Sequence, residues 1–286
     1  MLIRQNKKYR GFLKPSHWRR IALGSWAAPH DPTLYAIAEL NIEPALNYIE
    51  TVKAKTGERV TLTHFVGKVW GILLKLHPEL NSEIRWGKFY RRAQVDIAFQ
   101  VVIEKGKDQG GGAELSAGVI RNIDQTPLSE IAKQLNRSAH VIRTEDDPNY
   151  RALKKGTSPV PGIFFRPLLI ILGYILNVFN LWSPLLGIPQ DSFGSMMITN
   201  VGSLGVDWAF PALYPPANHV CILAIGASYK GPVYETDAQG TVTRTTLKRF
   251  VRLFGAFDHR YVDGIHAARV GRDLRKIFEE PEKYNV

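Results

Sequence analysis

The chain of 286 residues holds a single cysteine, Cys221. One cysteine cannot build a disulfide framework or a cysteine-rich metal site, and it favours a reducing compartment. The apolar run at residues 220–223 is typical of a buried strand. We therefore expect Cys221 to be a core thiol rather than a nucleophile.

Several enzyme motifs are also absent. There is no Gly-x-Ser-x-Gly elbow, which argues against an α/β-hydrolase, and no His-Glu-x-x-His pair, which argues against a zinc hydrolase. We expect no metal site. The glycine-rich run at 106–112 lacks the Gly-Lys-Ser/Thr ending of a phosphate-binding loop, so it is predicted to be a hairpin loop. The first residues contain no long apolar run, so no secretory signal peptide is visible.

Acidic residues are missing from the first 30 positions, while the net charge of the chain is +11. We call residues 1–15 the basic arm; this arm and the residues just after it hold seven cations, Arg4, Lys7, Lys8, Arg10, Lys14, Arg19 and Arg20. Such a segment can meet nucleic acid, acidic lipid, an acidic partner or a phosphate-bearing substrate. No nucleic-acid-binding module accompanies it, so we expect no nucleic acid partner. A solvated arm that only aids solubility is an equally good interpretation.

Hydrophobic periodicity predicts one mixed α/β domain. Helices are expected at 16–26, 43–55, 63–76, 127–144 and 265–278. Strands are expected at 33–41, 95–104, 114–120, 195–200, 220–229 and 242–257. We expect Gly57 to end the second helix.

The most informative segment is residues 258–264, Asp-His-Arg-Tyr-Val-Asp-Gly, between a predicted strand and a predicted helix. A neutral imidazole such as that of His259 is suited to take a proton from a thiol or hydroxyl near pH 7. Asp263 would sit at the helix N-terminus, where free N–H groups and the helix dipole keep a carboxylate ionised. The pattern predicts a general base next to a fixed negative charge. His266, on the same helix, is expected to be a surface or contact residue.

This heptapeptide resembles the Asp-His-Arg-x-x-Asp-Gly signature of the acyltransferase core of 2-oxoacid dehydrogenase complexes, a family that shares its fold with chloramphenicol acetyltransferase. Further similar segments follow in the family's order: 19–22 with 28–30, 118–125 with 128–132, and Ile-Thr-Asn-Val-Gly at 198–202. The resemblance covers nearly the whole chain. It implies an α/β two-layer sandwich, with helices packed on a mixed sheet, that forms trimers.

The resemblance also implies roles for particular residues. His259 would deprotonate the acceptor, which attacks the thioester of acyl-coenzyme A. Thr199, where the family usually has serine, would stabilise the oxyanion. Asn200 is a candidate substrate-binding residue. Asp263 would structure the loop through an N-terminal arginine, Arg19 or Arg20. In the family, histidine and hydroxyl residue come from different subunits of the trimer.

The acceptor stays open at this stage. We expect residues 1–286 to form a single catalytic domain with no lipoyl or peripheral-subunit-binding domain and no lipoyl-lysine, so that coenzyme A is a substrate and no cofactor is covalently bound. The protein could act on a free acceptor, or form a core that borrows the lipoyl domain of a separate protein. A non-catalytic scaffold of a multienzyme assembly is a third interpretation.

An apolar insertion at 160–190 departs from the family, which usually has a shorter, polar connection here. No residue from Pro167 to Ile188 is charged. The helical part, between Pro167 and Pro184, is short for a bilayer span, which takes roughly 20 apolar residues. A span would also divide one fold between two sides of a membrane. We therefore predict that the insertion is not a transmembrane segment. With no signal peptide visible, we expect a cytoplasmic protein, with membrane association as an alternative. A subunit-contact helix is the first choice; a wall of the acyl site and a peripheral membrane contact through 163–188 are alternatives.

Overall fold

The computed structural model describes residues 31–104, 113–144, 161–182, 190–214 and 217–286. The chain divides into two compact units, 1–32 and 33–286, and the fold described below is that of the second unit. The predicted helix at 16–26, the basic arm, Arg19, Arg20 and the predicted loop at 106–112 lie outside the described residues.

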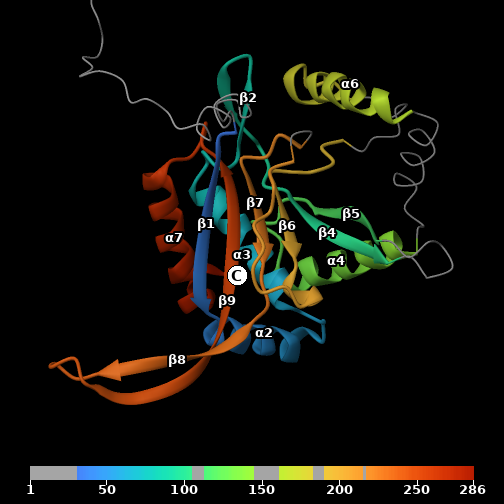
Figure 1. Cartoon of the computed structure of the whole chain (residues 1–286). Helices are drawn as coiled ribbons and strands as arrows, with labels where there is room; N and C mark the ends of the chain where they lie inside the picture. The colour runs from blue at the N-terminus through green and yellow to red at the C-terminus, as the bar shows by residue number, and fades with distance from the viewer. Residues whose placement is uncertain (1–30, 105–112, 145–160, 183–189, 215–216) are drawn as a thin grey trace, which may run out of the picture. The chain divides into compact units, whose positions relative to one another are not determined.

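A mixed sheet of seven strands forms one layer (Figure 1). Its strands run in the order β1-β9-β7-β6-β4-β5, with β8 paired to β9. β4, β6 and β7 are parallel neighbours, and the remaining pairs are antiparallel. The strands are β1 (Thr33–Asn41), β4 (Ile97–Glu104), β5 (Ala113–Ile120), β6 (Met196–Asn200), β7 (Cys221–Ile225), β8 (Tyr229–Thr236) and β9 (Val242–Asp258).

Four helices form the second layer: α2 (Glu43–Thr56), α3 (Leu62–Leu76), α4 (Leu128–Arg143) and α7 (Gly264–Glu279). α3 is apolar on most sides and packs against both α4 and α7. An added Cβ at Gly67 would lie 2.3 Å from the ring of Phe99 on β4, so glycine lets this helix approach the sheet closely. The predicted mixed sheet with packed helices is confirmed.

Successive side chains of a strand point to opposite faces of the sheet, so the two faces make different contacts. Leu34, Ala36, Ala38 and Leu40 of β1 pack into the main core beneath the helices. Tyr35 and Ile37 point to the other face and are 55% and 46% exposed. We call this second face the open face. The segment at 201–214 covers part of it, with the rings of Trp208 and Phe210 against Phe254.

The predicted elements within the described residues are confirmed to within a few positions, with two corrections. The single strand predicted at 220–229 is wrong: β7 ends at Ile225, and β8 begins at Tyr229 as a new pairing with Phe250 on the long strand β9. The backbone between β7 and β8 leaves the sheet, and the amide of Ala227 donates a hydrogen bond to the carbonyl of Val206. Gly57 ends α2 in the left-handed conformation, as predicted.

A small hairpin, β2 (Ser82–Arg85) and β3 (Lys88–Arg91), was not predicted. Trp86 and Gly87 form its two-residue turn, with φ angles of 51° and 71°. Such turns usually carry asparagine, aspartate or glycine first, so a tryptophan there gave no turn signal. Each strand is also only four residues long, which is too short for a clear alternation.

Residues 162–178 of the apolar insertion are helical, in line with the predicted helix. α6 (Gly162–Gly173) is followed by a π-helical turn, η2 (Tyr174–Val178). The helix begins five residues before Pro167 rather than at it. None of the helices in the described ranges is long and apolar enough to cross a membrane.

Candidate active site

The loop between β9 and α7 is held in place by Asp258, the last residue of β9. Its buried carboxylate accepts from the backbone amide of Arg260 at 2.9 Å and from the Arg260 guanidinium at 2.5 and 3.0 Å. Its carbonyl accepts from the amides of Tyr261 and Val262. The hydrogen bonds to this carboxylate raise the pKa of Arg260, so the guanidinium stays charged. The loop that carries His259 is therefore fixed at both sides of the histidine.

His259 is exposed, and Nδ1 of its ring lies 2.8 Å from the carbonyl oxygen of Val262. A carbonyl can only accept a hydrogen bond, so Nδ1 carries the proton in this arrangement. In the neutral form of the ring, Nε2 is then the nitrogen without a proton. A nitrogen in that state, on a fixed loop at the surface, can act as a general base.

Asp263 is the N-cap of α7, as the sequence predicts. Its carboxylate accepts from the amides of Ile265 at 3.0 Å and His266 at 3.3 Å, and it lies 2.7 Å from Nδ1 of His266. These hydrogen bonds lower the pKa of Asp263, and the bond with the His266 side chain contributes most. His266 thus closes a capping box rather than acting only as a surface residue. The Asp-x-x-His spacing was the signal that could have indicated this.

Tyr261, a position the sequence did not single out, joins the loop to the hairpin. Its hydroxyl accepts from the amide of Ile84 on β2 at 2.6 Å, and its ring packs edge-on against Phe89 on β3 at 5.4 Å. The ring is 7% exposed. Burial raises the pKa of its phenol, so the group remains a neutral hydroxyl.

Thr199 and Asn200 end β6. By the pleat, Met196 and Ile198 face the helices and Thr199 faces the open side, alongside Met197. The amide group of Asn200 donates to the Thr63 hydroxyl on α3 at 2.7 Å and accepts from the amide of Ser203 at 3.0 Å. These contacts give Asn200 a structural role in holding the strand end.

Thr199 and His259 are not brought together within one chain. Thr199 pairs with Ala224, which pairs with Phe254 on β9, and His259 follows Phe254 by five residues. At about 3.3 Å per residue and about 4.8 Å between strands, two strands apart, their Cα atoms are separated by roughly 15–20 Å. Figure 1 shows β6 and β9 running in opposite directions, so that their C-terminal ends lie at opposite ends of the strands.

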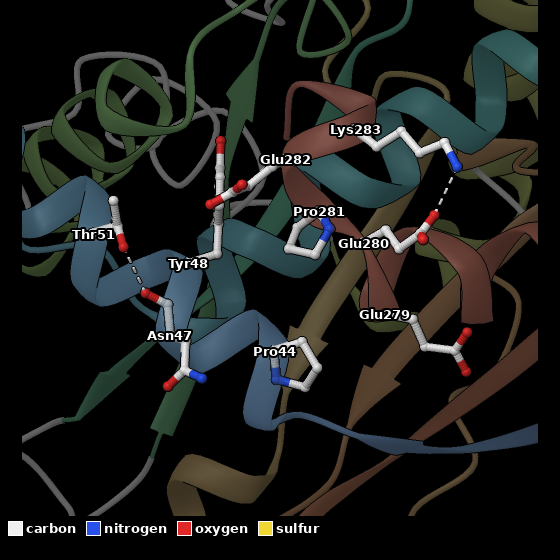
Figure 2. Close-up of a pocket in the computed structure, with 9 residues that line it drawn as sticks. All are labelled: Pro44, Asn47, Tyr48, Thr51, Glu279, Glu280, Pro281, Glu282 and Lys283. Carbon is white, nitrogen blue, oxygen red and sulfur yellow. Dashed lines mark hydrogen bonds and ion pairs between the residues drawn. The ribbon is translucent and has the colours of Figure 1, made fainter.

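A surface pocket between α2 and the 3₁₀ turn η6 (Pro281–Tyr284) carries none of these groups (Figure 2). Tyr48, Thr51 and three glutamates line it, and one of the glutamates, Glu280, pairs with Lys283 at 3.0 Å. Among the described residues no cluster of histidine, cysteine, aspartate or glutamate could hold a metal ion. Cys221 is buried, and desolvation raises its pKa to about 12, which confirms a core thiol.

Comparison with known proteins shows which family has this arrangement. Residues 25–148 and 189–286 match the model of the 2-oxoacid dehydrogenases acyltransferase catalytic domain. The chain belongs to this family. The match includes the His259 loop and the Thr199 strand, and it leaves out 149–188, which contain α6 and η2.

Two relatives of this chain are named as acetyltransferase components of larger enzyme systems. The chain is 27% identical over 231 residues to the dihydrolipoyllysine-residue acetyltransferase component of the acetoin cleaving system of Bacillus subtilis, covering 81% of this chain and 44% of the relative. It is 34% identical over 253 residues to the corresponding component of the mitochondrial pyruvate dehydrogenase complex of Neurospora crassa, covering 88% and 44%. The chain therefore spans less than half the length of these relatives.

Solved structures of the family share the fold. The dihydrolipoamide acetyltransferase of Azotobacter vinelandii, studied for the role of a serine, a histidine and an asparagine in its catalytic mechanism, superimposes with a TM-score of 0.64 at 20% identity, covering 90% of this chain and 85% of that one. The cubic core of a pyruvate dehydrogenase multienzyme complex gives 0.63 at 20% identity, covering 99% and 100%. The predicted fold and family are confirmed.

Proposed function

We propose that this protein transfers an acyl group between coenzyme A and a thiol or hydroxyl acceptor, with His259 as general base. The observation that carries the proposal is the bond between Nδ1 of His259 and the Val262 carbonyl, which makes Nε2 the proton-accepting nitrogen of the neutral ring on an exposed loop. Family membership supplies the reaction type.

The proposed reaction starts with proton transfer to His259. Nε2 of His259 takes the acceptor's proton, and the resulting thiolate or alkoxide attacks the thioester carbonyl carbon. The Thr199 hydroxyl donates a hydrogen bond to the oxyanion of the tetrahedral intermediate. The intermediate collapses by breaking the carbon–sulfur bond, and the imidazolium returns its proton to the coenzyme A thiolate. Asp263 orders the start of α7 beside the base.

The counterpart positions in the Azotobacter vinelandii enzyme support these roles. Its asparagine follows its histidine by four residues, as Asp263 follows His259. Threonine in place of serine keeps a hydroxyl at position 199, and its methyl group narrows the site. Asn200 is committed to Thr63 and Ser203, so we assign it to positioning the strand end rather than to substrate.

The site is completed by a second copy of the chain. Thr199 and His259 lie too far apart to act on one carbonyl group within a subunit, and Thr199 faces the open side of the sheet, where Tyr35 and Ile37 are also exposed. A neighbour that covers this face could bring its own His259 to Thr199. We propose a homotrimer or a larger homo-oligomer in which the site forms between subunits.

The acyl donor is acyl-coenzyme A, and the acceptor we favour is a dihydrolipoyl group on a separate protein. The relatives act on dihydrolipoyllysine residues, but the match covers only 44% of the length of each. A free acceptor is the second option. We propose that residues 1–286 form a single catalytic domain. We also propose that Arg19 or Arg20 pairs with Asp263, in addition to the contact that Asp263 makes with His266.

Mass spectrometry of the acceptor separates these options. Purified protein would be incubated with acetyl-coenzyme A and either dihydrolipoamide or chloramphenicol. We expect an acetylated product that His259→Ala abolishes and that the exposed His140→Ala on α4 leaves unchanged. Transfer that survives His259→Ala would refute the mechanism. A folded oligomer without transfer to either acceptor or to a lipoyl domain would favour the scaffold interpretation.

A further inference from the structure

The apolar insertion and the β2–β3 hairpin meet to form one surface, which we call the hairpin–helix face. The guanidinium of Arg85 on β2 donates to the carbonyl of Val178 in η2 at 3.2 Å, and the rings of Trp86 and Phe179 pack edge-on at 5.3 Å. Large apolar side chains remain exposed on both parts, among them Trp86, Phe89, Phe164, Ile171, Tyr174 and Phe179.

The helical part of the hairpin–helix face has an apolar composition that is unusual for a surface in contact with water. No residue from Pro167 to Trp182 is charged, and α6 carries one charged residue, Arg166, in its first half. Helices of that kind are found buried or in contact with lipid. Exposed apolar patches of this kind usually mark a contact surface. The family model leaves this segment unmatched, so the shared acyltransferase fold does not account for it.

Among the described side chains of this face, the charge is positive and comes from the hairpin. Lys88 and Arg91 are exposed, and Arg85 lies over the ring of Tyr90 at 5.3 Å. The hairpin's acidic residue, Glu83, is already paired with Arg92. Exposed aromatic rings beside lysine and arginine are the side chains that occupy the interface between lipid headgroups and acyl chains.

We propose that the hairpin–helix face binds the surface of a membrane that contains anionic lipid. α6 and η2 together would be about 25 Å long at 1.5 Å per residue, less than the roughly 30 Å of a bilayer core, so the helix lies in the interface and does not cross it. The cations of the hairpin then meet the lipid phosphates. In a two-fold contact with a second copy, Lys88 and Arg91 would instead lie near the same cations of that copy. The repulsion between these like charges disfavours such a contact.

The hairpin–helix face is also connected to the loop that carries His259, although the membrane proposal does not depend on acyl transfer. Tyr261, in the catalytic loop, bonds to Ile84 and packs on Phe89 of the same hairpin. A membrane bound by the hairpin–helix face would therefore lie next to the loop that carries His259.

Co-sedimentation of the full chain with vesicles tests the proposal. We expect binding to vesicles of phosphatidylcholine with phosphatidylglycerol and weaker binding to phosphatidylcholine alone. Ile171→Glu with Tyr174→Glu, both exposed positions, should abolish it. Lys88→Gln with Arg91→Gln should weaken binding to anionic vesicles roughly 25-fold, about fivefold for each charge near the surface. The matched control, Lys230→Gln with Arg244→Gln on the β8–β9 ribbon, should bind like wild type.

Three outcomes would overturn the proposal. The first is wild-type protein that binds neither kind of vesicle. The second is a control pair that loses as much binding as the hairpin pair, since general charge rather than this face would then be responsible. The third is an Ile171→Glu with Tyr174→Glu variant that breaks into smaller species in light scattering without lipid, which would show a subunit contact instead.

Discussion

The hydroxyl of Tyr261 accepts a 2.6 Å hydrogen bond from the amide of Ile84, 177 positions earlier in the chain. This bond fastens a four-residue strand, β2, to the loop that presents His259. Two short segments without strong structure of their own are thereby held against each other. The geometry of the base depends on a residue that does not react.

Tyr261→Phe should therefore destabilise the protein by about 1–2 kcal/mol, because a partly buried amide loses its acceptor while the ring keeps its packing. Urea unfolding measures the change. Tyr234→Phe on the exposed β8 strand is the matched control, expected to change stability by less than about 0.5 kcal/mol. Equal stability of the two variants would show that the Ile84 bond contributes nothing.

Thr199→Ala should lower kcat by roughly 10²–10³, the usual cost of losing one oxyanion donor, while Thr199→Ser should stay within a few-fold of wild type. Steady-state kinetics with acetyl-coenzyme A and the acceptor found above supply the measurement. If the serine variant were as impaired as the alanine variant, the hydroxyl would not be the group that matters.

Mixing inactive chains tests whether the site lies between subunits. His259→Ala and Thr199→Ala chains, refolded together in equal amounts, should recover activity, because roughly one quarter of the sites would pair an intact histidine with an intact threonine. Each variant refolded alone is the control. No recovery in a mixed oligomer of the right size would place both residues of a site in one chain.

Stability should fall as the pH drops from about 6.5 to about 4. Burial lowers the pKa of His64 and of His219 from 6.5 to about 4 in the folded protein, and Arg59 and Arg92 respectively add to the effect. In this window the unfolded chain binds protons that the folded chain does not, so each histidine contributes a loss of up to roughly 1.4 kcal/mol per pH unit. Above pH 6.5 their full contribution to stability is present.

Urea unfolding at several pH values measures this slope. His219→Gln should make it shallower even if the variant is less stable overall, and the exposed His140→Gln should leave it unchanged. An equal slope in wild type and His219→Gln would contradict the assignment.

Gly202→Ala should be destabilising by about 1–3 kcal/mol, because its Cβ would lie 2.3 Å from the Gly226 carbonyl oxygen and the backbone there must move. Gly271→Ala is the matched control. Its Cβ meets nothing within 4 Å in the middle of α7, so this change should stabilise the protein by about 0.5–1 kcal/mol. Thermal unfolding of both variants should show shifts of opposite sign.

Local patterns predicted much of this fold because periodicity and caps act over a few residues. Gly57 and Asp263 mark helix ends through their own backbone and side chain, and Thr33–Asn41 alternates because one face of β1 is covered. The position of His259 on a loop between β9 and α7 followed from the same signals.

The remainder depends on contacts between distant segments. The partner of Tyr261 is a backbone amide on a hairpin whose turn residue, Trp86, gives no turn signal. Asn200 sits beside Thr199 in sequence, but its hydrogen bond to Thr63 is set by how α3 crosses the sheet. The family resemblance implied that the histidine and the hydroxyl residue of one site come from different subunits, but the distance between Thr199 and His259 within one chain could not be predicted until the strand register was known.

That separation also governs how activity scales with assembly. If every site takes its histidine from one subunit and its threonine from the next, a closed ring has as many sites as subunits, whereas two subunits joined by one such contact have a single complete site and two unused halves. Specific activity per chain would then rise with protein concentration as rings close, and dilution would inactivate the enzyme without unfolding any subunit.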